Sequence, residues 1–338
     1  MIRLAPGEND LYKLSVADYV ADSVANGRMS IAQGHTALRR LDRETDRRGK
    51  ALQVLAFGLA AAGVAGLWKL PWLDIATAGM IGMSIGLLTQ YTDKRPATKE
   101  AGEALAGLLA GVVAALVASL VGPLNLNTVI IASLVVLLPG MSLTNAFNEL
   151  ASQHWVSGTA RLAGAVTTVL KLTVGAVIAV TLTQLVGLNP QAAAVRPQAG
   201  WVEWASLLVA AYAFAVLFKA NRRDYLWIMA AAMSGYVIAR YAGHAWGGPA
   251  GVFASAMALT AAGNLFGRVV QKPGALIRLP GIIMLVPGST SLRGFLTLVQ
   301  QQDVTVGQAA LLAVTNIVMA LVAGLLFGNL LIPARKNL

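Results

Sequence analysis

The sequence predicts an all-α, polytopic membrane protein with ten transmembrane helices, arranged as two inverted five-helix repeats. Three observations predict this fold. Of the 338 residues, 57% are hydrophobic and only 12% are charged, whereas a soluble protein carries about 25% charged residues. Apolar runs of about 20 residues, the length that spans a bilayer, recur along the chain. A Pro-Gly pair interrupts one such run in each half.

The first 50 residues are polar and charged, and they predict a cytoplasmic segment at 1–50 ahead of the membrane part. An arginine-rich run leads to Lys50, which favours an anchor on anionic lipid or, alternatively, a regulatory surface. No signal peptide is visible in this segment. The first apolar helix is therefore expected to act as its own insertion signal.

Two helices are predicted within this segment. Residues Leu11–Asn26 can form an amphipathic helix, with Ser15 and Asp18 at the spacing of a helix cap. Ser30 and Gln33 have the spacing of a capping box, which predicts the start of a second helix.

Ten apolar spans follow, at about 51–68, 72–90, 104–121, 127–146, 162–187, 203–218, 225–242, 249–267, 279–300 and 308–331. Basic residues concentrate in the loops after the even-numbered spans, so the positive-inside rule places both termini in the cytoplasm. The net charge of +11 is therefore interpreted as a topology signal and not as a sign of nucleic-acid binding.

An odd number of spans per half makes the two halves opposite in orientation. The first repeat is predicted at 51–187, a linker loop at 188–202, and the second repeat with a short cytoplasmic tail at 203–338. The fourth span then runs inward and the ninth runs outward. Inverted repeats with paired broken helices are typical of transporters, whose substrate site lies near the middle of the bilayer.

The two breaks are Pro139-Gly140 and Pro287-Gly288, which are 148 residues apart. Proline stops a helix because it lacks an N–H donor and clashes with the preceding turn. A helix that restarts there offers free backbone N–H groups and a positive dipole end, which suit a carboxylate. The predicted substrate-binding residues are Pro139, Gly140, Ser142, Thr144, Asn145, Pro287, Gly288, Ser289, Thr290, Ser291 and Arg293.

A simpler interpretation of each break remains. The Pro-Gly pair can merely kink a helix while the hydroxyl groups bond to the carbonyls of their own helix. Arg293 occupies the position of Asn145 in the other repeat. It can hold a substrate carboxylate or pair with a buried acid, or its side chain can reach the outer interface instead.

Acidic residues are scarce in the membrane part. Asp74 and Glu149 are the candidates for proton coupling, because a carboxyl group beside a low-dielectric cavity can take up and release a proton. Glu103, Glu203 and Asp224 lie at span starts and are expected at the interface.

Lys171 is a third coupling candidate. If the fifth span begins near Leu162, Lys171 lies about 14 Å inside it, where it would pair with Glu149 or line the cavity. An earlier helix start is the alternative. The chain has no Cys, and its three His residues lack ligand spacing, so no metal or other cofactor is expected. No phosphate loop or nucleophile–base pair is visible, which argues against an enzyme.

Two blocks of residues resemble the conserved blocks of the threonine/serine exporter family. They are Leu138-Pro139-Gly140, Leu143-Thr144-Asn145, Glu149-Leu150, Gly158 and Arg161-Leu162, then Asn264, Arg268, Pro273, Pro280-Gly281-Ile282 and Val286-Pro287-Gly288-Ser289. The resemblance runs from about Asp10 to the C-terminus. Family members usually have a longer N-terminal part and an Asp at the position of Glu149, and Lys171 is not expected from the family.

The resemblance implies a ten-helix inner-membrane exporter of threonine and serine, a secondary transporter working as a proton-driven antiporter. The family's split relatives imply a dicarboxylate exporter of the succinate type as the alternative. A channel, or a scaffold that recruits a partner through residues 1–50, is a weaker reading. The expected partners are the small-molecule substrate, protons and the lipid bilayer, without nucleic acid, and a homo-oligomer is left open.

Overall fold

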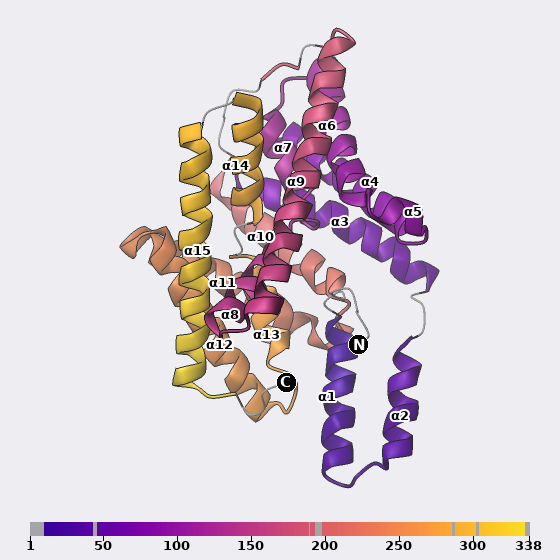
Figure 1. Cartoon of the computed structure of the whole chain (residues 1–338), viewed down its shortest axis with the longest axis vertical. Coiled ribbons are helices and arrows are strands. Elements are labelled where there is room, and N and C mark those ends of the chain that lie inside the picture. Colours follow the sequence, from indigo (N-terminus) through magenta and orange to yellow (C-terminus); the bar gives the residue numbers. More distant parts are fainter. Residues whose placement is uncertain are drawn as a thin grey trace.

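The computed structural model describes residues 10–42, 46–188, 190–192, 198–285, 288–301 and 304–334. These residues form α-helices joined by short turns (Figure 1). The isolated bridge between Leu124 and Ala192 is the one β-type pairing within these ranges. The predicted all-α class is therefore confirmed.

The N-terminal segment forms the two predicted helices, which hang below the rest of the molecule in Figure 1. They are α1 (Leu11–Ala25) and α2 (Ile31–Arg39), followed by a 3-10 turn at Arg40–Asp42. The capping box of Ser30 and Gln33 is confirmed. The predicted cap of α1 is wrong, because Asp10 caps this helix and the Ser15 hydroxyl donates to Leu11 O.

Seven helices are long and apolar enough to cross a membrane, among the residues that the structure describes. This finding supports the multi-pass prediction. These helices are α3 (Arg47–Leu67), α4 (Trp72–Thr92), α6 (Gly102–Leu120), α9 (Trp155–Leu185), α10 (Gly200–Leu217), α12 (Gly248–Val269) and most of α15 (Val304–Leu331). Short helical turns, α5 (Pro96–Lys99) and Arg222–Asp224, lie between them.

The other three predicted spans fall on α11 (Tyr225–Trp246) and on two interrupted helices. The first is divided into α7 (Leu126–Ser133) and α8 (Gly140–Ala151), and the second into α13 (Ala275–Ile283) and α14 (Gly288–Gln301). The break at Pro139-Gly140 is thus confirmed, whereas Pro287 lies outside the described residues. In Figure 1 the chain descends from α7 to α8 and rises from α13 to α14.

Helix α9 begins earlier than predicted. It starts at Trp155 and not near Leu162. Its first turns are too polar to belong to the apolar run, so hydropathy placed the start too late. The helix runs from the top of the molecule down to α8, and it packs against α6 in its upper part and α8 in its lower part (Figure 1).

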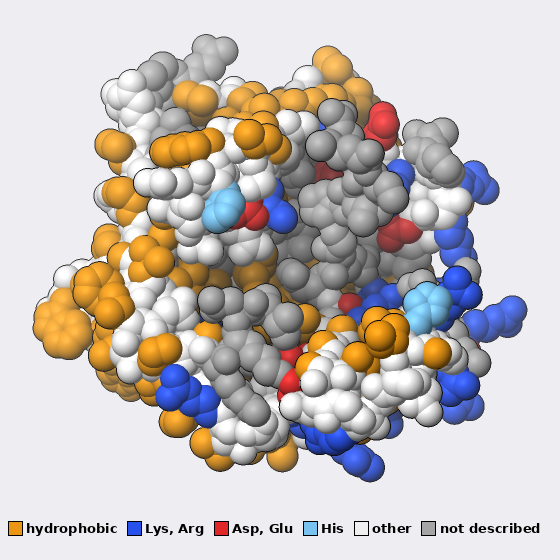
Figure 2. All heavy atoms as spheres, turned by 60° about the horizontal axis from the view of Figure 1, so that its bottom comes forward, with side chains coloured by type: hydrophobic (Ala, Val, Ile, Leu, Met, Phe, Trp, Pro, Cys, Tyr) orange, Lys and Arg blue, Asp and Glu red, His pale blue; other side chains and the backbone are white. Residues whose placement is uncertain are grey.

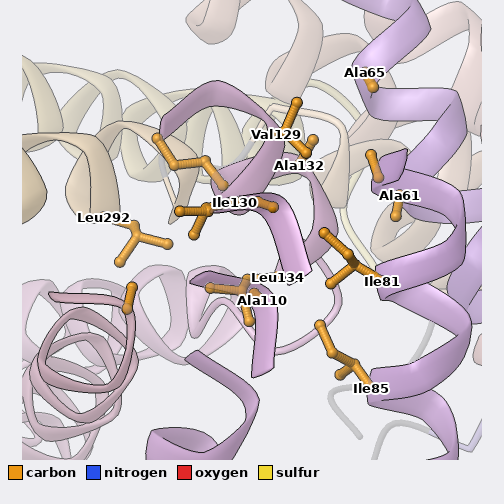
Figure 3. Packing of buried hydrophobic residues seen from close by; sticks show 14 of the residues in the cluster. Ala61, Ala65, Ile81, Ile85, Ala110, Val129, Ile130, Ala132, Leu134 and Leu292 are labelled. Atoms are coloured by element: carbon orange, nitrogen blue, oxygen red, sulfur yellow. The ribbon is translucent and has the colours of Figure 1, made fainter. Parts of the chain in front are cut away.

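Helix α7 lies in the middle of a hydrophobic core (Figure 3). Its Ile130 is fully buried, with Ile81 of α4, Ala110 of α6 and Leu292 of α14 in the same cluster. Small side chains allow the surrounding backbones to approach closely, as is usual between helices in membranes. The core therefore surrounds the short helix that precedes the first break.

The contact between α6 and α9 requires glycine. A Cβ atom at Gly175 would lie 2.0 Å from Ala104 O, so we expect Gly175→Ala to force the helices apart and cost about 1–3 kcal/mol. Thermal unfolding in detergent measures this loss. Gly164→Ala on the same helix is the control, because nothing lies within 4 Å of its added Cβ. Equal unfolding temperatures for the two variants would contradict the packing.

Candidate functional site: a cavity between two helix breaks

The two helix breaks touch each other. A Cβ atom added to Gly288 would lie 3.0 Å from the Cβ of Leu138 and 3.6 Å from the Cα of Gly140. Leu138 precedes the start of α8, and Gly288 is the first residue of α14. The folded chain therefore brings together two segments that the sequence places in different halves.

A cavity of about 160 Å³ lies at this meeting point. The volume equals that of about five water molecules in the liquid, and it is smaller than the 300–1,000 Å³ of pockets that hold drug-sized ligands. The cavity therefore suits a compact solute. It is lined by Val64, Leu67, Trp68, Val135, Val136, Leu138, Gly140, Met141, Phe214, Tyr236, Ile283, Met284, Gly288 and Ser289.

The N-terminal ends of α8 and α14 reach the wall of this cavity through Gly140 and Gly288. Among the described residues no side chain caps α8, whose cap position is Pro139, and the Gly140 N–H donates to Leu138 O at 2.8 Å. The first N–H groups of a helix lack partners within the helix, and together they carry partial positive charge. Both helix starts can therefore attract an anionic group in the cavity.

The polar residues of the first break take different positions. Thr144 is buried, and its Oγ1 has no hydrogen-bond partner in the described part of the chain. Ser142 is half-buried and Asn145 is exposed, and neither is among the residues that line the cavity. Of the first repeat's predicted binding residues, the structure places Gly140 in the cavity wall.

At the second break, Ser289 lines the cavity. The Ser291 hydroxyl instead donates to Gly288 O at 2.7 Å, which matches the simpler interpretation of that hydroxyl. The side chain of Thr290 lies outside the described residues. The guanidinium of Arg293 lies 5.9 Å from the centroid of the Trp68 ring, within the range of a cation–π contact. Arg293 therefore contacts a residue of the cavity wall but does not itself line the cavity.

A buried charge cluster adjoins the cavity through Tyr236. The Tyr236 hydroxyl donates to Glu203 Oε1 at 2.8 Å. Glu203 is 3% exposed and also pairs with Lys69 Nζ at 3.0 Å and with the guanidinium of Arg240. Tyr236 and Arg240 are four residues apart on α11 and so lie on one face of that helix.

Glu203 lies in the first turn of α10 and Asp224 directly before α11, so both lie at span starts as predicted, but their side chains are buried within the protein. Asp224 is 3% exposed and pairs with Lys272. Sequence reasoning missed these buried acids because their cations come from distant parts of the chain. A signal was present, since Lys69 and Arg240 are basic residues where the positive-inside pattern does not expect them.

Asp74 is fully buried near the start of α4. Its Oδ2 accepts a hydrogen bond from Asn125 Nδ2 at 2.7 Å. Its Oδ1 has no partner in the part of the chain that the structure describes. Burying an ionised carboxylate is costly without compensation, so this group is well suited to hold a proton.

Glu149 and Lys171 do not meet. Glu149 pairs with Arg161 Nε at 2.6 Å. Lys171 donates to Glu100 O at 2.8 Å and pairs with Glu103 at 3.5 Å. The predicted pairing of Glu149 with Lys171 is thus wrong, because α9 starts early and carries Lys171 to the beginning of α6.

We expect Glu203→Gln to destabilise the protein, because it leaves Lys69 and Arg240 without their buried counter-charge. Losing one partner of a buried ion pair costs about 3–5 kcal/mol, and we expect about 3 because both cations are about one-third exposed. Chemical or thermal unfolding in detergent measures the loss. Glu103→Gln is the control, since the Glu103 side chain is 32% exposed and such pairs contribute about 0–1 kcal/mol. An equal effect of both variants would contradict the cluster's role.

Comparison with known protein families finds a match for each half of the chain. Residues 1–183 match the family described as "Putative threonine/serine exporter", and residues 203–331 match the family described as "Threonine/Serine exporter, ThrE". No curated protein and no solved structure matches the chain. Because the first match covers more than half of the residues, the chain belongs to the threonine/serine exporter family.

Proposed function

We propose that this protein is a secondary active exporter of threonine and serine across the inner membrane. The observation that carries this proposal is the cavity where the two helix breaks meet. The starts of α8 and α14 would hold the substrate carboxylate through backbone N–H groups. The Ser289 hydroxyl, which lines the same cavity, would bond the polar remainder of the substrate.

Transport in this proposal proceeds by alternating access around the cavity. The two repeats, 51–187 and 203–338, are joined by the linker 188–202 and related by inverted orientation across ten spans. The opposite directions of the two interrupted helices in Figure 1 support this arrangement. Rocking of one repeat against the other would expose the cavity first to one side and then to the other.

The proposed topology has both termini in the cytoplasm. Figure 2 turns the lower end of Figure 1, where α1 and α2 lie, toward the reader, and Lys and Arg side chains gather along the right and lower edges of this view. Positive charge of this kind marks the cytoplasmic side of a membrane protein. The cavity would therefore load from the side of α1.

Export would be driven by antiport of protons, with Asp74, Glu149 and Lys171 as the candidate carriers. Their surroundings favour Asp74. Asp74 is fully buried and forms no ion pair among the described residues, whereas Glu149 and Lys171 each form one. A protonated Asp74 would avoid the cost of a buried charge.

A dicarboxylate exporter is the second candidate function, and the position of Arg293 favours it. A second carboxylate requires a second cation, and the Arg293 guanidinium lies against Trp68 at the cavity wall. A channel would instead show flux that no pH gradient accelerates.

We expect Ser289→Leu to reduce threonine export at least tenfold, because the larger side chain would fill the small cavity. Efflux of labelled threonine and succinate from proteoliposomes, with and without a pH gradient, measures this effect. Thr297→Leu on the same helix is the control, since Thr297 does not line the cavity. Full export by Ser289→Leu, or export of succinate alone by the unaltered protein, would contradict the proposal.

A second variant separates binding from coupling. We expect Asp74→Asn to retain exchange of labelled for unlabelled threonine but to lose the acceleration by a pH gradient. The amide keeps the polar contact with Asn125 and cannot carry a proton. Acceleration that persists in Asp74→Asn would exclude this residue as the carrier, and Glu149→Gln would be measured next.

A further inference from the structure

A second, larger pocket lies on the side of the protein that carries the N-terminal helices. Its volume is about 410 Å³. Helix α1 forms one wall, the turn between α12 and α13 forms another, and the end of α15 closes it. The pocket is therefore a contact region between the N-terminal segment and the membrane part.

Helix α1 places a half-buried carboxylate, Asp18, in the wall of this pocket. Leu11 is 1% exposed, and its N–H donates to Phe218 O at 2.9 Å, which fixes the start of α1 against α10. Asp18 follows Leu11 by two helical turns and so lies on the same face, together with Leu14. A helix face that packs on a protein is normally apolar, so Asp18 departs from the pattern at the pocket.

The opposite wall carries an arginine. Arg278 of α13 lines the pocket and is half-buried. The neighbouring Lys272 is already paired with Asp224. In the described part of the chain, neither Asp18 nor Arg278 forms a hydrogen bond or an ion pair. The pocket thus holds one uncommitted carboxylate and one uncommitted guanidinium.

The neutral polar groups of the pocket are largely satisfied. Asn264 Nδ2 donates to Asn329 Oδ1 at 2.8 Å and to Ile332 O at 2.6 Å. These bonds hold α12 against the end of α15. The polar groups of the pocket that remain available to a ligand are therefore mainly the carboxylate of Asp18 and the guanidinium of Arg278.

Helix α13 connects this pocket to the central cavity. Arg278 lines the pocket, and Ile283 lines the cavity, five residues further along the same helix. At 1.5 Å per residue, that separation is about 8 Å. Helix α13 therefore contributes to the walls of both the pocket and the central cavity.

We propose that this pocket is a docking site for a small zwitterionic α-amino acid, which binds there before it enters the central cavity. Arg278 binds the carboxylate and Asp18 binds the ammonium group. A dicarboxylate is disfavoured, because its second negative charge would lie beside Asp18 and Asp22. This inference rests on the proposed function. It adds the place where the substrate first binds and a preference for a zwitterion over a dicarboxylate.

The natural sequence contains no Cys, so a single introduced Cys reports on one place. Ala21 is exposed and lines the pocket. We expect threonine or serine to slow maleimide labelling of Ala21→Cys at least threefold in nanodiscs, and succinate to leave it unchanged. Ala32→Cys on exposed α2 is the control, whose labelling neither solute should alter.

Charge variants test which groups bind. We expect Arg278→Gln and Asp18→Asn each to abolish protection of Ala21→Cys and to raise the half-saturating threonine concentration for export at least tenfold. Arg223→Gln is the matched control, because Arg223 is exposed on the same side and does not line the pocket. Gly267→Leu should also abolish protection by filling the pocket, since an added Cβ there meets nothing closer than 3.4 Å.

The outcomes separate this inference from the proposed function. Threonine export with no protection of Ala21→Cys, or with unchanged half-saturation in Arg278→Gln, would overturn the docking site and leave the exporter in place. Protection by succinate and not by threonine would overturn the preference for a zwitterion over a dicarboxylate. An unaltered protein that exports neither amino acid would contradict the proposed function itself, whatever the labelling shows.

Discussion

The structure depends on one constraint: a backbone that leaves its helix inside a membrane must be covered by protein. Hydrocarbon offers no hydrogen bonds, so the free N–H and C=O groups of a broken helix cannot face lipid. This chain brings its two breaks together, with Gly288 against Leu138 and Gly140. The packed core around α7, the helix that precedes the first break, fixes that part of the chain (Figure 3). A cavity that presents two helix starts follows from this arrangement, and so does its small volume.

Buried charges fix the helices around that cavity. Glu203 joins the end of α3 to α10 and α11 through Lys69, Tyr236 and Arg240. Asp224 joins the start of α11 to the turn before α13 through Lys272. Such pairs contribute little net stability, but removing one partner of a buried pair is costly. They therefore fix which helices lie next to one another. One of them reaches the cavity directly, because Tyr236 contributes to its wall.

Features set by neighbouring residues, such as a helix break, could be predicted from the sequence. Ion pairs between distant segments could not. The break at Pro139 was predictable because a proline followed by a glycine inside an apolar run disfavours a continuous helix. The all-α class and the multi-pass character followed from composition. For Glu203, the unusual positions of Lys69 and Arg240 were a signal of buried charge, but hydropathy alone could not show that these residues of other helices meet Glu203. Lys171 was misplaced for a related reason: its depth depends on the start of α9, and the polar first turns of that helix carry no hydropathy signal.

Among the predicted binding residues, Ser289 and Ser291 look alike in sequence, and only their position on α14 separates a cavity residue from one bonded to its own helix.

The contact between the two breaks is the central claim, and a cross-link measures it directly. In a protein without natural Cys, Leu138→Cys combined with Gly288→Cys places two Cβ atoms 3.0 Å apart, so a small outward shift reaches the 3.5–4.5 Å that a disulfide requires. Mild oxidation should form the bond in most molecules, stop threonine export, and allow export to resume after reduction. Failure to cross-link while both thiols react with maleimide, or full export by the cross-linked protein, would contradict the account.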